Sequence, residues 1–109
     1  MLQQIEELLT APTSGASAPT LARMEDTLTE GYAQALALEA ERWRIERRLG
    51  EVVRTVTGPD PDVSSLSEEL SQLATRLTSN DGELTSLRTL LGSLHERARS
   101  VRRAARTAH

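Results

Sequence analysis

Residues that could catalyse a reaction or bind a metal are few, and their spacing fits no established pattern. His95-Glu96 begins like the zinc-protease motif, but that motif needs a second His where Arg99 stands. A di-iron bundle needs a Glu three residues before a His, and Gly92 occupies that position. The chain has no cysteine, which excludes thiolate sites. We therefore expect a non-enzymatic protein without a metal or cofactor.

The polar residues of greatest interest are Arg42 and Asn80, because each interrupts an apolar seven-residue pattern. Placed in a core, a guanidinium needs acceptors, and carboxylates flank both positions. We expect one polar layer that fixes the register of two helices at some cost in stability. A small-ligand or cation site at the same place is the alternative. The expected layer consists of Arg42, Asn80, Glu39, Asp81, Glu41 and Glu83.

Two long helices must position this layer. Apolar residues recur at alternating intervals of four and three from Leu66 to Ala108, which is the heptad pattern of a coiled coil. A second such seam runs from Leu21 to Val56. We predict helices over about 20–57 and 65–107, with Thr20 as the first N-cap. The Ser65–Glu68 capping box starts the second helix, with Asp60-Pro61 as a competing start, and that helix continues through Ser79–Gly82.

Residues 58–64, GPDPDVS, form a short turn, so the two helices must run antiparallel. A short turn restricts the register to one that pairs Val56 with Leu66 and Gly31 with Leu91, and this register puts Arg42 opposite Asn80. The predicted fold class is all-α: an antiparallel two-helix coiled-coil hairpin over residues 19–109. Residues 1–18 are a short amphipathic segment followed by a flexible Pro/Ser/Thr/Ala linker. This segment either packs on the protein's own end or binds a partner.

A second apolar stripe beside the first seam predicts an interaction face. A two-helix hairpin cannot bury this stripe by itself, and exposed aromatic residues commonly anchor interfaces. We expect two hairpins to pair into a four-helix bundle, so that the protein is a homo-oligomer, with a dimer favoured. A different partner protein is the alternative. The stripe consists of Tyr32, Leu36, Trp43 and Leu90.

The C-terminal end is basic, with five Arg and no acid from Arg97 onward. Four of them share one helical face: Arg99, Arg102, Arg103 and Arg106. A solvated end that suits the helix dipole is the first interpretation, and docking to an acidic partner or to phosphates is the second. The net charge of −3 and the lack of aromatic residues among these arginines argue against nucleic acid.

The expected location is the cytoplasm, because we find neither a signal peptide nor an apolar run of the roughly 20 residues that span a bilayer. All 13 basic residues are Arg, which suggests a bacterium with a GC-rich genome. In size and shape the chain resembles the hairpin substrates of actinobacterial type VII secretion. It lacks their Trp-x-Gly turn, since Trp43-Arg44-Ile45 lies within a helix, and it lacks their Tyr-based signal. Anti-sigma coiled coils that bind cyclic dinucleotides are another hairpin class, but the sequence assigns no family.

These features predict a self-associating scaffold or adaptor. The alternative is a regulatory protein, anti-sigma-like or secretion-associated, that sequesters or recruits a partner through the aromatic stripe or the N-terminal segment.

Overall fold

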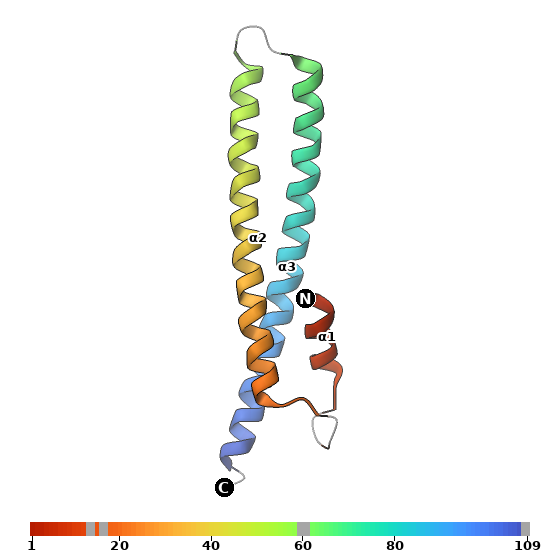
Figure 1. Cartoon of the computed structure of the whole chain (residues 1–109), viewed down its shortest axis with the longest axis vertical. Coiled ribbons are helices and arrows are strands. Elements are labelled where there is room, and N and C mark those ends of the chain that lie inside the picture. The colour runs from red at the N-terminus through yellow and green to blue at the C-terminus, as the bar shows by residue number, and fades with distance from the viewer. Residues whose placement is uncertain (13–14, 16–17, 59–61, 108–109) are drawn as a thin grey trace. The chain divides into compact units, whose positions relative to one another are not determined.

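The computed structural model describes residues 1–12, 15, 18–58 and 62–107, and these ranges contain three helices and no strand (Figure 1). Helix α1 spans Leu2–Thr10, α2 spans Leu21–Val56 and α3 spans Val63–Thr107. The predicted all-α hairpin fold is confirmed. Residues 59–61 of the predicted turn, which include the alternative start at Asp60-Pro61, lie outside the described residues, as do four linker positions and Ala108.

The start of α2 follows the prediction, whereas the start of α3 does not. The Thr20 Oγ1 atom accepts a hydrogen bond from the Arg23 amide at 3.1 Å, which is the geometry of an N-cap. Helix α3 begins two residues before the predicted position, and Asp62 is its cap, because the Asp62 Oδ1 atom accepts from the Ser65 amide at 3.3 Å. The Ser65–Glu68 capping box is therefore wrong: Ser65 already lies in the first turn, as the donor to the cap.

Helix α3 continues without interruption through Ser79–Gly82, as predicted. This tetrapeptide contains poor helix formers, yet Leu77 and Leu84 keep the heptad phase on either side of it. The packing of that apolar face outweighs the low local propensity.

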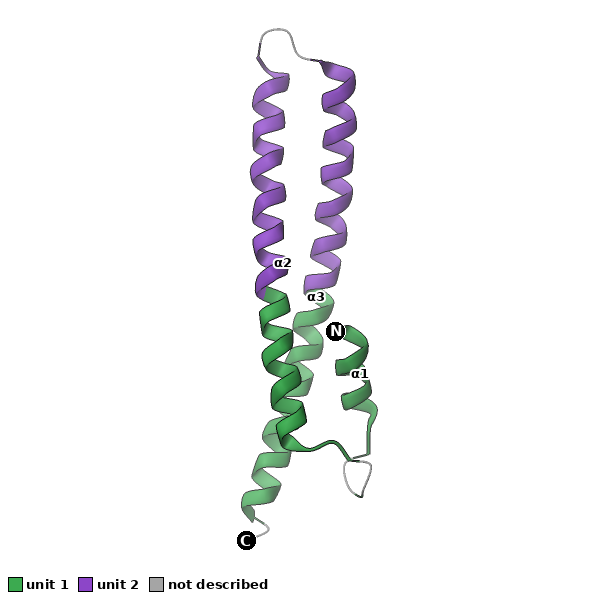
Figure 2. Cartoon of the chain, in the orientation of Figure 1, with its two compact units in different colours: residues 1–35, 85–109 green, residues 36–84 purple. Residues whose placement is uncertain are grey.

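The chain divides into two compact units, each built from parts of both long helices (Figure 2). Unit 1 consists of residues 1–35 and 85–109, and unit 2 consists of residues 36–84. Unit 1 is a three-helix unit, because α1 packs with the first part of α2 and the last part of α3. Unit 2 contains two antiparallel helical segments.

In unit 1 most of the described seam residues are buried, and α1 adds two of the most buried side chains among the described residues. Ile5 is 0% exposed and Leu8 is 3% exposed. Gly31 lies directly against the Leu91 side chain, which is the pair that the predicted register places in one layer. The other buried apolar residues of this unit are Met24, Leu28, Ala35, Leu87, Leu94 and Ala98.

The seam of unit 2 is less covered. Ile45, Val52 and Leu73 form its buried cluster, and Leu49, Leu66 and Leu77 pack partly buried against it. Two apolar seam residues, Leu70 and Val56, are exposed. Two helices cannot enclose both sides of a leucine seam, so some of its side chains reach solvent.

Candidate functional site

The predicted polar layer lies in unit 2, and Asn80 is its buried member. Asn80 is 6% exposed, and its Nδ2 atom donates a hydrogen bond to the Leu38 carbonyl at 3.0 Å. Its Oδ1 atom is buried and has no hydrogen-bond partner in the part of the chain that the structure describes. Asn80 therefore links the two helices through one hydrogen bond and leaves one acceptor unused, which costs stability.

Arg42 lies at the edge of this layer rather than inside it. Its side chain is 44% exposed, with Nη1 at 3.2 Å from Asp81 Oδ1 and Nε at 3.0 Å from Glu46 Oε1. The expectation of a desolvated guanidinium in the seam is therefore wrong. An Arg side chain is long enough to reach past the seam edge, so its charge stays in water and pairs with carboxylates there.

Of the acidic residues expected around Arg42, Asp81 pairs with it, whereas Glu41 pairs with two other arginines. Glu41 pairs with Arg76 on α3 and with Arg44 at 3.1 Å on its own helix. The hydrogen bond from Arg76 and then that from Arg44 hold the pKa of Glu41 below its ordinary value of 4.5. Glu39 is half-buried and Glu83 is exposed.

A second ion pair joins the helices of unit 2 nearer the turn. Arg48 donates to Glu69 through Nε and Nη2, the latter at 3.0 Å, and contacts Glu51 at 3.0 Å. This two-point pair lowers the pKa of Glu69 and raises that of Arg48. Together with the pair between Glu41 and Arg76, it links α2 to α3 in this unit.

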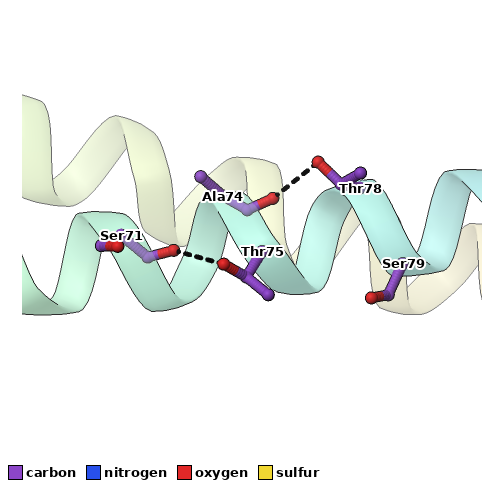
Figure 3. A pocket seen from close by; sticks show the side chains of 5 residues that line it. All are labelled: Ser71, Ala74, Thr75, Thr78 and Ser79. Carbon is purple, nitrogen blue, oxygen red and sulfur yellow. Dashed lines mark hydrogen bonds between the residues drawn. The ribbon is translucent and has the colours of Figure 1, made fainter.

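Two shallow hollows lie on the described residues of unit 2. One follows α3 alone, and Figure 3 shows the residues that line it. The Thr75 and Thr78 hydroxyls donate to the carbonyls of Ser71 and Ala74 at 3.0 Å each. Both hydroxyl protons are therefore used in hydrogen bonds within α3. A second hollow lies between the helices beside Asn80 and includes Glu41, Arg76 and Glu83.

The predicted interaction stripe is distributed over both units. Leu36 and Trp43 lie on the α2 segment of unit 2 and are 66% and 60% exposed. The Arg47 guanidinium lies 5.4 Å from the centroid of the Trp43 ring, which is a cation–π contact. Tyr32 is exposed in unit 1, whereas Leu90 is half-buried in that unit and therefore contributes less surface than predicted.

No protein family, no curated protein and no solved structure matches the chain.

The most developed polar contact of unit 1 involves Arg97, which the sequence analysis did not single out. Its guanidinium donates to the carbonyls of Leu9 and Ala11, and more weakly to that of Pro12 at 3.4 Å. These carbonyls belong to the end of α1 and the residues that follow it, where no intrahelical donor remains. A signal exists in the sequence: the end of α1 has neither a Gly nor a basic residue in its last turn, so its carbonyls need a donor from elsewhere.

The C-terminal arginines are exposed, and two of them form ion pairs within unit 1. Arg102 pairs with Glu25 on α2, and Arg99 contacts Glu96 at 3.4 Å. Arg103 and Arg106 are exposed in the last turns of α3. This arrangement favours the solvated helix end over a phosphate-binding stripe, because part of the positive charge is neutralised within the protein.

Among the described residues, no cluster of His, Cys, Asp or Glu could hold a metal ion. None of the helices in those residues is long and apolar enough to cross a membrane.

Proposed function

We propose that this protein is a non-enzymatic scaffold or adaptor that self-associates, and that two copies pair along the α2 face of unit 2. The observation that carries this proposal is the exposure of Leu36 and Trp43 on one helix face. Large aromatic residues such as Trp43 are enriched at the centres of protein interfaces, and Leu36, seven positions earlier, extends the apolar surface along the same helix face.

The surroundings of Trp43 favour a second copy as the partner. Interfaces between identical copies use one patch twice, so the patch must complement itself. In an antiparallel pair of α2 helices centred on Trp43, a residue n positions before Trp43 faces the residue n positions after it. Glu39 then faces Arg47 of the partner subunit, and the reciprocal contact forms on the other side of the axis.

The same arrangement also matches shapes. Leu36 lies seven positions before Trp43, and Gly50 lies seven positions after it. A Cβ atom at Gly50 would be in ordinary van der Waals contact with Arg54 Nη1, at 3.8 Å, so the flexible end of the Arg54 side chain borders the space above this glycine. Leu36 of one copy packs over Gly50 of the partner subunit in this arrangement, once the end of the Arg54 side chain moves aside.

Paired charge reversals test this arrangement. Glu39→Arg places two arginines opposite each other at both contacts, and Arg47→Glu places two glutamates there, so each variant alone is expected to be monomeric. When the two variants are mixed, arginine faces glutamate at both contacts, and a heterodimer is expected in native mass spectrometry.

A matched control reverses a charge outside the proposed contact, for example Glu68→Arg on α3. It should leave the mass of the wild-type assembly unchanged. If Glu39→Arg and Arg47→Glu both keep that assembly, the antiparallel pairing is wrong.

The second candidate function is the recruitment of a different protein through the same exposed residues. It predicts that the purified chain is a monomer or a weak dimer, and that the partner protein stabilises it. The N-terminal segment is a weaker candidate for a freely available binding helix, because Ile5 and Leu8 are already buried within unit 1.

A further inference from the structure

The place where α1 packs on unit 1 has the properties of a helix-binding site. It buries Ile5 and Leu8 almost completely, three residues apart on one face of a short helix. At the end of that helix, the Arg97 guanidinium donates to two carbonyls, those of Leu9 and Ala11. Proteins recognise amphipathic helices by apolar side chains at i, i+3 spacing, and basic side chains bind the open carbonyls at a helix C-terminus.

Helix α1 is weakly tied to this site. It has nine residues, fewer than an isolated helix needs, so it is helical because it is docked. Its N-cap position, Met1, forms no side-chain capping hydrogen bond, and its C-terminal carbonyls depend on Arg97. Only two of its side chains are buried. The free energy needed to open such an element locally is far smaller than the free energy of global unfolding.

The surface under α1 is built by the two long helices. Between them Gly31 packs on Leu91 and Glu25 pairs with Arg102, and neither contact involves α1. When α1 leaves, α2 and α3 of unit 1 therefore retain their contacts with each other, and an apolar surface next to Arg97 becomes accessible.

We propose that this surface is an exchangeable helix-binding site: α1 is its intrachain occupant, and an amphipathic helix of a partner protein takes its place. The expected partner segment has Ile or Leu three residues apart and a carboxyl end without its own cap. Its polar face is acidic, like that of α1, which carries Glu6 and Glu7 and no basic residue. The Nε atom of Arg97 is buried and has no hydrogen-bond partner among the described residues. A partner that supplies an acceptor there would form one more hydrogen bond than α1 does.

This inference is independent of the proposed pairing along α2, since every contact that supports it lies in unit 1 and those of the pairing lie in unit 2. Loss of the α2 pairing would leave the site intact.

The test uses the full chain and a fluorescent peptide of residues 1–12 as the probe. The double variant Ile5→Asp, Leu8→Asp empties the site, because two carboxylates cannot be buried there. It should bind the probe at least about tenfold more tightly than the wild-type chain, whose own α1 competes at a high effective concentration. Adding Arg97→Gln to the emptied variant should weaken binding of the probe by about tenfold. Fluorescence anisotropy measures the affinity of the wild-type chain, the double variant and the triple variant for the probe. Gln4→Asp, at an exposed position of α1, is the matched control and should behave like the wild-type chain.

Three results would overturn the proposal. The first is an emptied variant that keeps its helical circular dichroism and fails to bind the probe at about 100 µM. The second is an emptied variant that loses the helices α2 and α3, since α1 would then be an integral part of the fold. The third is displacement of the probe by the unlabelled wild-type chain as effectively as by the unlabelled peptide, because the occupant would then be α1 of a second copy.

Discussion

At the scale of single residues, Asn80 is expected to lower the stability of the fold. It occupies a leucine position in the α3 seam, forms one hydrogen bond to α2, and buries an acceptor that has no partner in the described chain. Buried polar residues of this kind are retained in coiled coils because they favour one register over others.

Replacing Asn80 with Leu is expected to raise the free energy of unfolding by about 1–2 kcal/mol, because an unpaired acceptor is removed and an apolar side chain is buried instead. Chemical denaturation of the purified chain measures this change. Asn80→Ala is the control and should lower stability, since it leaves a cavity. Equal losses for both variants would show that the hydrogen bond to Leu38 is a net stabilising contact.

From the ion pairs of unit 2 we predict that the stability of the protein depends on pH. The pKa values of Glu41 and Glu69 in the folded protein lie below 4.5 because Arg76 and Arg48 donate hydrogen bonds to them. The stabilisation from a lowered carboxyl pKa is complete above the pKa of the unfolded chain and is lost as the pH falls through the folded pKa. The melting temperature should therefore be lower at pH 3 than at pH 7.

Glu69→Gln should reduce this difference in melting temperature, because one of the two titrating pairs is removed. Both pairs are at the surface, so we expect a modest effect that decreases with added salt. If the melting temperature of Glu69→Gln fell as much between pH 7 and pH 3 as that of the wild-type chain, the pair with Arg48 would contribute nothing to the stability of the fold.

At the scale of elements, two glycines in helices have opposite roles. Gly31 of α2 lies against Leu91, and an added Cβ atom would overlap the end of that buried side chain. Gly82 of α3 has no atom within 4 Å of the position of an added Cβ. The first glycine permits close packing of two helices, and the second only weakens its helix.

Gly82→Ala should therefore raise the free energy of unfolding by about 0.5–1 kcal/mol, the usual difference in helix propensity. Gly31→Ala gains the same propensity but forces Leu91 to move, and we expect a net loss of about 1 kcal/mol. Equilibrium denaturation of both variants gives the comparison. If Gly31→Ala were as stabilising as Gly82→Ala, the close contact between α2 and α3 at this layer would be wrong.

The elements themselves follow from the sequence, because heptad spacing over long segments is an unambiguous signal. The spacing predicted α2 and α3. The short turn between them predicted their antiparallel arrangement and the pairing of Gly31 with Leu91. The start of α3 was harder to predict, because Asp and Ser are both good N-cap residues. In the structure Asp62 is the cap, and Ser65 is not.

The candidate sites were less predictable from the sequence. The position of the Arg42 charge depends on how far a long side chain extends past the seam, which spacing cannot give. The contact between Arg97 and α1 joins segments more than 80 residues apart, and no periodicity relates them.

At the scale of the whole molecule, the protein presents two surfaces to which we assign different roles. We propose that the exposed α2 face of unit 2 joins two copies of the chain. We propose that the helix-binding site of unit 1, which α1 occupies, binds a partner helix. A dimer of this kind carries two identical helix-binding sites. That is the minimum an adaptor needs to bring two partner molecules together.

The solution mass of the chain, measured by light scattering during size exclusion, tests the central claim of self-association most directly. The account predicts a wild-type mass of twice 12.0 kDa, and a mass of 12.0 kDa for Trp43→Glu, whose charge cannot be buried between two copies. A wild-type chain that stays at 12.0 kDa over the accessible concentrations, or a Trp43→Glu variant that keeps the doubled mass, would contradict it.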